Sequence, residues 1–389
     1  MSAAFNPLVE TLSPPPVPSV FAWAKAYQGD LGPLIDLSQA VPGYAPHPQL
    51  LQWLGEAAQS TDCAGYGPIE GDPALRDAYA EDIAALYEAN VTRANIHITA
   101  GCNQAFMCAL MAVAGAGDTI ALTDPFYFNH ESTLAMLGIR HELLQLDPEN
   151  SFLPDMASVN DMLSRGIKAL ALVSPNNPTG AVYPAALLRE IFDACRDAGV
   201  WLILDETYRD FLPSGQQPHD LLSSGKWEDN LVLLYSFSKS FCIPGHRLGA
   251  VTAGPNMIAQ IAKVMDNMQI CAPRAPQAAV AKAISALSEW RDENRLEIFR
   301  RTEALKEAFK ALPGWSMDSL GAYFAFVRHP FESLASAEVA EKLAKQVGVL
   351  AIPGAYFGAR HENYLRFAFA NADVQTISKL PARLSKFSI

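Results

Sequence analysis

The most informative stretch of this sequence is Tyr235-Ser-Phe-Ser-Lys-Ser-Phe-Cys-Ile-Pro-Gly-His-Arg-Leu-Gly249. Lys239 follows an apolar run typical of a buried strand, the hydroxyls of Ser236 and Ser238 precede it, and Arg247 comes eight positions later. A lysine held at the end of a strand among small residues can lose its water, which lowers its pKa and exposes the nucleophilic free amine. A plain turn lysine would fit the same pattern, so this segment alone leaves both interpretations open.

A second segment, Leu202-Ile-Leu-Asp-Glu-Thr-Tyr208, places a carboxylate at the end of another apolar run. Ligands of open α/β sheets bind outside the carboxyl ends of the strands, so we expect Asp205 and Lys239 to converge there. Asp205 could instead cap the N-terminus of a helix. In either case a buried carboxylate needs a positive partner or several hydrogen-bond donors.

Two more segments follow apolar runs, namely Val173-Ser-Pro-Asn-Asn-Pro-Thr-Gly180 and Ile98-Thr-Ala-Gly-Cys-Asn-Gln104. By itself the first indicates only a turn. In the second, Gly101 lets backbone N–H groups face an anion at the N-terminus of the following helix. One such glycine is a weak signal.

Between residues 95 and 255, short apolar runs alternate with longer amphipathic ones, which predicts β-α-β units and a largely parallel sheet. The predicted strands are Ile96–Thr99, Thr119–Thr123, His141–Leu146, Ala169–Val173, Trp201–Leu204 and Leu231–Ser236, with helices over 104–113 and 184–198. The chain then favours a nearly continuous helix over 276–311, a strand over 322–327, a helix over 337–346, a strand over 364–369 and a terminal helix. This later part has an α+β pattern.

The pattern therefore predicts two domains. We expect a large domain over residues 46–275, and a small domain that combines residues 1–45 with residues 276–389. The first 45 residues are too few for a separate core, so we expect them to pack on the C-terminal part.

Composition narrows the classes of partner. Half of the 389 residues are apolar and 18% are charged, which excludes a wholly disordered or fibrous chain. With 29 basic and 41 acidic residues the net charge is −12, which disfavours binding to nucleic acid or anionic lipid. An anionic ligand would need a local cluster of cations.

Six cysteines without a CxxC pair, and no histidines at metal-ligand spacing, predict free thiols in a reducing compartment and no metal site. The N-terminus has no signal-peptide pattern, and no apolar stretch approaches the roughly 20 residues of a membrane helix. We therefore expect a cytoplasmic protein that does not contact membranes.

The four segments, in this order, resemble the class I/II aminotransferases, which are pyridoxal-phosphate (PLP) enzymes of fold type I. The resemblance extends from Ile35-Asp-Leu-Ser-Gln-Ala-Val-Pro42 to Leu365-Arg-Phe367. It implies an α/β fold with a mostly parallel seven-stranded sheet between helices in the large domain, plus a smaller α+β domain. It also implies transfer of the amino group of an L-amino acid to a 2-oxo acid by a ping-pong mechanism.

The resemblance also implies roles for the residues that face the cofactor. Lys239 matches the lysine that forms the Schiff base with PLP and later moves the substrate proton. Asp205 matches the carboxylate that pairs with the pyridine nitrogen. Tyr208 and Asn177 match the groups that hydrogen-bond the 3′-oxygen, and Tyr127 matches the aromatic residue stacked on the ring.

For the phosphate, the resemblance implies several donors, as a dianion requires. They are Arg247, the hydroxyls of Ser236 and Ser238, and the backbone of Gly101, Cys102 and Asn103. Cys102 departs from the family, since Ser or another small residue often stands there. His130 could support Asp205 from behind.

On the substrate side, Arg366 resembles the arginine that grips the α-carboxylate at two points. Tyr66 matches a tyrosine that reaches the phosphate in the neighbouring subunit, which implies a homodimer with shared active sites. Ala40 stands where many relatives have glycine in the loop lining the substrate pocket. The only nearby candidate for a second cation, which a dicarboxylate would need, is Arg274. It matches no family motif, and the pattern favours an exposed arginine at the start of a helix.

Two alternatives remain open. A C–S lyase, a decarboxylase or a synthase on the same fold would use the same lysine and aspartate. A non-catalytic ligand-sensing domain is a more remote alternative, because the sensors of this type carry a basic DNA-binding module ahead of the domain. Here the resemblance begins near residue 35, and the net charge of −12 disfavours binding to DNA.

Overall fold

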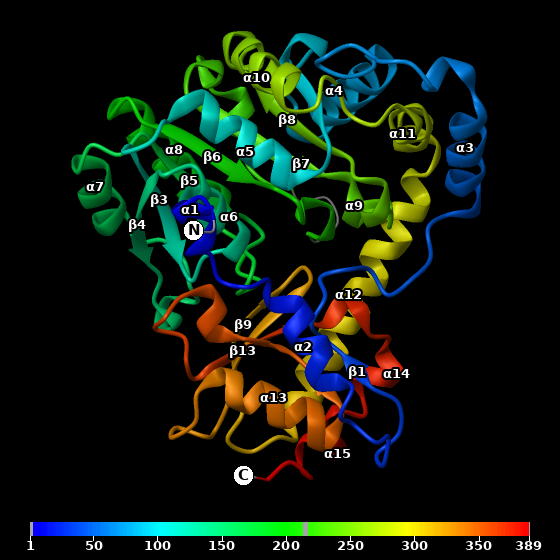
Figure 1. Cartoon of the computed structure of the whole chain (residues 1–389), viewed down its shortest axis with the longest axis vertical. Helices are drawn as coiled ribbons and strands as arrows, with labels where there is room; N and C mark the ends of the chain where they lie inside the picture. The colour runs from blue at the N-terminus through cyan, green and yellow to red at the C-terminus, as the bar shows by residue number, and fades with distance from the viewer. Residues whose placement is uncertain (1–2, 213–216, 389) are drawn as a thin grey trace.

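The computed structural model describes residues 3–212 and 217–388 of the chain. Figure 1 shows two parts, a larger one built around a wide sheet and a smaller one below it that contains the C-terminus. Helix α12 (Ser288–Lys310) runs from the larger part into the smaller one. The buried apolar residues form two clusters: the first holds the core of the wide sheet and extends to Phe326 and Ile352 of the smaller part, and the second lies mainly in the smaller part.

A seven-stranded sheet forms the centre of the larger part, in the order β2-β8-β7-β6-β5-β3-β4. Only β8 runs antiparallel to its neighbours among these strands. The strands are β2 (Ile96–Thr99), β3 (Thr119–Asp124), β4 (Arg140–Gln145), β5 (Ala169–Val173), β6 (Trp201–Asp205), β7 (Leu231–Ser236) and β8 (Gly249–Ala253). The mostly parallel sheet and its six predicted strands are confirmed, with ends shifted by at most one residue.

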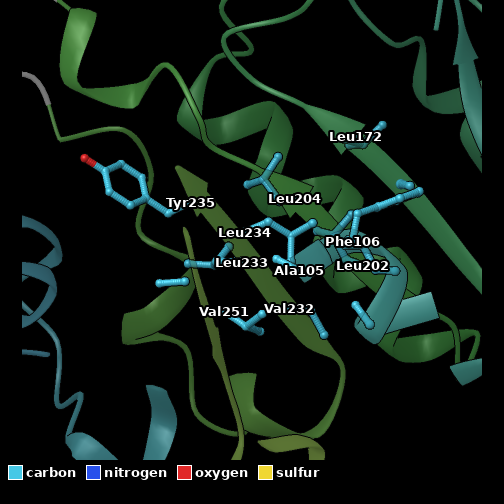
Figure 2. Close-up of a cluster of buried hydrophobic side chains, with 14 of the residues drawn as sticks. Ala105, Phe106, Leu172, Leu202, Leu204, Val232, Leu233, Leu234, Tyr235 and Val251 are labelled. Carbon is cyan, nitrogen blue, oxygen red and sulfur yellow. The ribbon is translucent and has the colours of Figure 1, made fainter. Parts of the chain in front are cut away.

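The central strands are apolar throughout because helices cover both faces of the sheet. Every residue of β5 and β7 is buried. Leu172 and Leu204 are paired in register and point to one face of the sheet, whereas Leu234 points to the opposite face. Figure 2 shows these side chains together with Ala105 and Phe106 of helix α5 (Cys102–Val113). The helices of this part are α3 (Pro48–Gln59), α4 (Pro73–Tyr87), α5 (Cys102–Val113), α6 (Phe128–Met136), α7 (Met156–Ser164), α8 (Ala185–Asp197), α10 (Pro255–Met268) and α11 (Arg274–Ala286). The short helix α9 (Phe237–Ser240) directly follows β7.

The smaller part holds a four-stranded antiparallel sheet in the order β12-β13-β10-β9. Its strands are β9 (Ser316–Gly321), β10 (Phe324–Arg328), β12 (Ile352–Pro353) and β13 (Tyr364–Ala368), and its helices are α2 (Pro16–Ala24), α13 (Ser336–Val347), α14 (Val374–Ile377) and α15 (Leu380–Leu384). Strand β1 (Ile35–Asp36) pairs in parallel with β11 (Val349–Leu350), which attaches the N-terminal segment to this part. The expected α+β architecture is confirmed.

Two expectations need correction. The nearly continuous helix predicted over 276–311 is two helices, because the backbone leaves the helical conformation at Leu287 (φ −115°, ψ 25°) and the chain changes packing partners there. In addition, helix α1 (Pro7–Glu10) contacts α6 of the larger part, so the first 45 residues do not all pack on the C-terminal part.

The position of α11 also bears on the domain boundary. This helix packs on α3 and α4, and its buried residues belong to the cluster of the large sheet. A boundary at residue 275 therefore lies one helix too early for this packing. We propose to place it at Leu287, between α11 and α12.

Among residues 3–212 and 217–388, no helix combines the length and the apolar character that crossing a bilayer requires.

Candidate active site

A cavity of about 430 Å³ opens at the carboxyl ends of the central strands. Three of its lining residues end strands, namely Val173 of β5, Asp205 of β6 and Ser236 of β7. Parallel strands place their carboxyl ends at one edge, so segments far apart in sequence meet there. The predicted site residues that line the cavity are Ala40, Cys102, Asn103, Tyr127, Asn177, Asp205, Tyr208, Ser236, Ser238, Lys239, Arg247 and Arg366.

Lys239 lies in the short helix α9, and its Nζ donates to the carbonyl oxygen of Ala40 at 2.5 Å. Burial, followed by the positive charges of Arg366 and Arg247, lowers the pKa of Lys239 to about 8. The sequence pattern predicts this desolvated amine. With this pKa, about one tenth of the amine is uncharged at pH 7, far more than for a solvated lysine.

Asp205 is 5% exposed, and its carboxylate has three partners. The backbone N–H of Thr207 donates to Oδ1 at 2.9 Å, while His130 Nε2 lies 3.5 Å and Cys102 Sγ 3.4 Å from Oδ2. Burial alone would raise the pKa of Asp205, but the hydrogen bonds and charge of His130 and the donation from Thr207 bring it below its usual value. Asp205 is thus an ionised, buried carboxylate, and His130 is its salt-bridge partner among the described residues.

A cradle of donors forms where β7 and α9 meet the N-terminus of α5. Ser236 caps α9, and its Oγ accepts from the N–H of Ser238 at 3.3 Å. Ser238 Oγ is buried and has no hydrogen-bond partner among the residues that the structure describes. Gly101 has φ +88°, and a Cβ there would overlap the Arg247 guanidinium. The cradle therefore combines a free buried hydroxyl, a helix N-terminus and a guanidinium.

Arg366 of β13 is 2% exposed and reaches the cavity from the smaller part. Its Nη1 donates to Asn177 Oδ1 at 3.0 Å and its Nη2 donates to the carbonyl oxygen of Ser38 at 2.5 Å. Its Nε has no hydrogen-bond partner within the described ranges. Burial lowers the pKa of Arg366 to about 10, so the guanidinium is charged at neutral pH, and no carboxylate of the described residues pairs with it.

Two phenols complete the walls. Tyr127 lies edge-on to His130, with ring centroids 5.1 Å apart, and burial raises its pKa to about 12. Tyr208 packs against Phe324 of β10 at 4.9 Å, and burial raises its pKa well above the usual value. Both phenols are protonated at neutral pH and can act as hydrogen-bond donors.

Four residues singled out in the sequence do not line the cavity. His130 lies behind the wall, where it pairs with Asp205. Gly101 lies behind Arg247, where it makes room for the guanidinium. Tyr66 is 79% exposed on the surface of the chain. Arg274 forms an ion pair with Asp72 at 3.2 Å and donates to the carbonyl oxygen of Asp62, beside a different surface hollow.

A sequence model described as "Aminotransferase class I and II" matches residues 32–384 of the chain. The chain belongs to this aminotransferase family. The protein is accordingly a transaminase, an enzyme that transfers amino groups between amino acids and 2-oxo acids.

The relatives of this aminotransferase include enzymes named as aromatic and as aspartate aminotransferases. It is 29% identical to the aromatic aminotransferase ISS1 of Arabidopsis thaliana, over 94% of this chain and 93% of the relative. It is 26% identical to an aspartate aminotransferase of Pyrococcus horikoshii, over 81% of each chain. A Thermus thermophilus aspartate aminotransferase structure, a double mutant, has a TM-score of 0.91 with 23% identity and full coverage of both chains, which establishes the shared fold.

The aminotransferase cavity also contains residues that the motifs did not predict. They are Val17, Ser38, Gln39, Val41, Phe128, Val173, Thr207 and Pro244. Thr207 and Ser38 lie inside segments that carry the resemblance, so position within those segments could have suggested them. Val17 and Phe128 carry no chemical signal in the sequence, because their contribution is apolar surface.

Proposed function

We propose that the cavity binds pyridoxal 5′-phosphate and that Lys239 and Asp205 use it to move an amino group from an L-amino acid to a 2-oxo acid by a ping-pong route. The observation that carries the proposal is that one cavity holds both an amine that can lose its proton, on Lys239, and a carboxylate that stays ionised, on Asp205. A partly buried amine with its pKa lowered to about 8 shares the cavity with a buried carboxylate whose pKa lies below its usual value.

The residues fit this cofactor. The unpartnered Ser238 hydroxyl, the guanidinium of Arg247 and the N-terminus of α5 suit a phosphate. Asp205 suits a protonated ring nitrogen, and Tyr127 supplies an aromatic face. When bound, the cofactor supplies an aldehyde that condenses with amines and a ring that accepts the electrons left at the substrate Cα after deprotonation.

Lys239 would serve as nucleophile and as proton carrier. Its Nζ is partly unprotonated near neutral pH, as covalent attachment requires. The same atom can take a proton from the substrate Cα and return one, because a displaced free amine is a base of suitable strength. An arginine could do neither, since its guanidinium remains protonated.

Other side chains would hold charges and orient the reactants. Ionised Asp205 would keep a proton on the ring nitrogen. Tyr208 and Asn177 would donate to the ring oxygen, and Arg366 would bind the α-carboxylate through a guanidinium that already lacks an anion. A fixed carboxylate orients the Cα–H bond relative to the ring.

We further propose a homodimer in the cytoplasm. Tyr66 is a large aromatic side chain that is 79% exposed, which suits a contact with a second copy of the chain that would complete the phosphate site. The six free cysteines suit a reducing compartment.

The test is a half-reaction without acceptor. Holoenzyme mixed with an L-amino acid should yield stoichiometric pyridoxamine phosphate and the 2-oxo acid. Release of pyruvate or ammonia without pyridoxamine phosphate would instead establish a lyase. Lys239→Ala should abolish turnover, whereas Lys263→Ala on the exposed side of α10 should retain it. Full activity of the Lys239 variant would refute the role of this lysine.

A further inference from the structure

The short segment Ser38–Val41 lies between the two cations that would hold the reacting part of an amino acid. The carbonyl oxygen of Ser38 accepts from Arg366, and that of Ala40 accepts from Lys239, each at 2.5 Å. If the proposed function holds, the α-carboxylate lies at the first of these cations and the Cα near the second. The amino acid side chain then lies beside this segment.

The surfaces available to that side chain are mostly apolar. Val41 and Gln39 of the segment line the cavity, together with Val17 of α2 and Phe128 of α6, and all four are partly buried. Phe128 belongs to the Arg366 end, because its ring centroid is 5.5 Å from that of Phe357, and the Arg366 guanidinium lies 5.1 Å from the same Phe357 ring. Gln39 is the neutral polar member of this group.

Among the described residues, each cationic side chain that lines the cavity is already used for a purpose other than binding the substrate side chain. Lys239, Arg247 and Arg366 are those cations, and the proposed function uses them for the amine chemistry, the phosphate and the α-carboxylate. The other candidate, Arg274, is engaged by Asp72 outside the cavity. The described residues of this chain therefore offer no unengaged cation to a side-chain carboxylate of the substrate, and desolvating a carboxylate without a positive partner is costly.

We infer that the amino donor carries an uncharged, largely apolar side chain, aromatic or branched aliphatic, and that dicarboxylic amino acids are poor donors. This inference rests on the proposed function. In a ping-pong route the same pocket receives the 2-oxo acid, so phenylpyruvate should be a better acceptor than 2-oxoglutarate.

The experiment compares L-phenylalanine, L-leucine, L-aspartate and L-glutamate in the half-reaction of the purified holoenzyme. We expect kcat/KM for phenylalanine to exceed that for aspartate by about tenfold or more. Equal or faster reaction of aspartate or glutamate would overturn the inference and leave transamination intact. A cation supplied by a second subunit would produce that outcome.

A binding measurement separates this inference from the proposed function. The unreactive acids 3-phenylpropionate and succinate are titrated while the absorbance of the bound cofactor is followed. We expect 3-phenylpropionate to bind more tightly, and tighter binding of succinate would overturn the inference. If 3-phenylpropionate binds more tightly but no amino acid reacts, transamination is refuted while the apolar pocket is supported.

A matched pair of variants tests the position of the pocket. Val17→Arg adds a cation to its wall, whereas Val17→Met adds similar length without charge. We expect the first variant to raise the aspartate-to-phenylalanine ratio of kcat/KM by about tenfold and the second to leave it nearly unchanged. The same ratio in both variants would place Val17 outside the side-chain pocket and overturn that assignment.

Discussion

The thiol of Cys102 donates to the carboxylate of Asp205, with Sγ 3.4 Å from Oδ2. Burial, and then the negative charge of Asp205, raise the pKa of this thiol well above its usual value, so it is a neutral donor. Cys102 occupies the position where the family often has a hydroxyl or another small residue. A thiol is a weaker hydrogen-bond donor than the hydroxyl of a serine would be at this position.

Substitutions of Cys102 should therefore change how strongly the Asp205 carboxylate is stabilised by a hydrogen bond. Cys102→Ser offers a stronger donor and should retain activity, whereas Cys102→Ala removes the donor and should lower kcat/KM by about two- to tenfold, equivalent to about 1 kcal/mol. The pH dependence of the bound-cofactor absorbance should shift in opposite directions in the two variants. Identical pH profiles in both would show that the thiol does not act on Asp205.

Asp205→Asn should separate cofactor binding from proton abstraction. The neutral amide cannot keep a proton on the ring nitrogen, so we expect retained cofactor and a loss of kcat on the order of 100-fold or more. The measurements are cofactor content by absorbance and steady-state turnover. Asp193→Asn on the partly exposed surface of α8 is the control, and normal turnover in the Asp205 variant would contradict the assigned role.

The pKa of Lys239 predicts how cofactor attachment depends on pH. The free amine is the reactive form, so the rate at which apoprotein binds PLP covalently should rise with pH around a midpoint of about 8. Burial is the main cause of the low value and Arg366 is the next, so Arg366→Met should move the midpoint upward. Stopped-flow absorbance measures both profiles, and a midpoint near 10 in the native protein would show a solvated lysine.

The strand ends and the residues that follow them could be predicted because each motif is local in sequence. Lys239 and Asp205 each follow an apolar run, and parallel strands bring such ends together. The contact of Lys239 with Ala40 joins positions 199 residues apart, and no local pattern encodes it. The exact composition of the substrate pocket was therefore not predictable.

Two features of the fold were missed for a related reason. Strand β8 consists of small residues, Gly-Ala-Val-Thr-Ala, and it is a strand because β2 and β7 pair with it on either side. The break at Leu287 has no Gly or Pro to mark it, since the change of packing partner from α3 and α4 to the smaller part causes it. Tertiary contacts determine both.

Gly101→Ala should weaken cofactor binding more than it weakens the fold. The residue has φ +88° and ψ 168°, a region that is essentially restricted to glycine and costs another residue about 1–3 kcal/mol, and the added methyl group would displace Arg247 from the phosphate cradle. We expect a lower affinity for PLP by equilibrium dialysis and a modest fall in Tm. Gly166→Ala, with φ +77° and no atom within 4 Å of its added Cβ, is the control for a methyl group at a positive-φ glycine that contacts no cradle residue. Equal PLP affinity in the two variants would show that Gly101 does not position Arg247.

Arg366→Lys should show whether the α-carboxylate is bound at two points. A lysine keeps the charge but loses the fork geometry, and it cannot also hold Asn177 and Ser38 as the guanidinium does. We expect kcat/KM to fall by about 100-fold, or about 3 kcal/mol, mainly through KM, while the PLP content stays normal. Arg274→Lys is the matched control, because Arg274 pairs with Asp72 outside the cavity and should leave KM unchanged. A larger rise of KM in the Arg274 variant than in the Arg366 variant would show that Arg366 is not the arginine that binds the α-carboxylate.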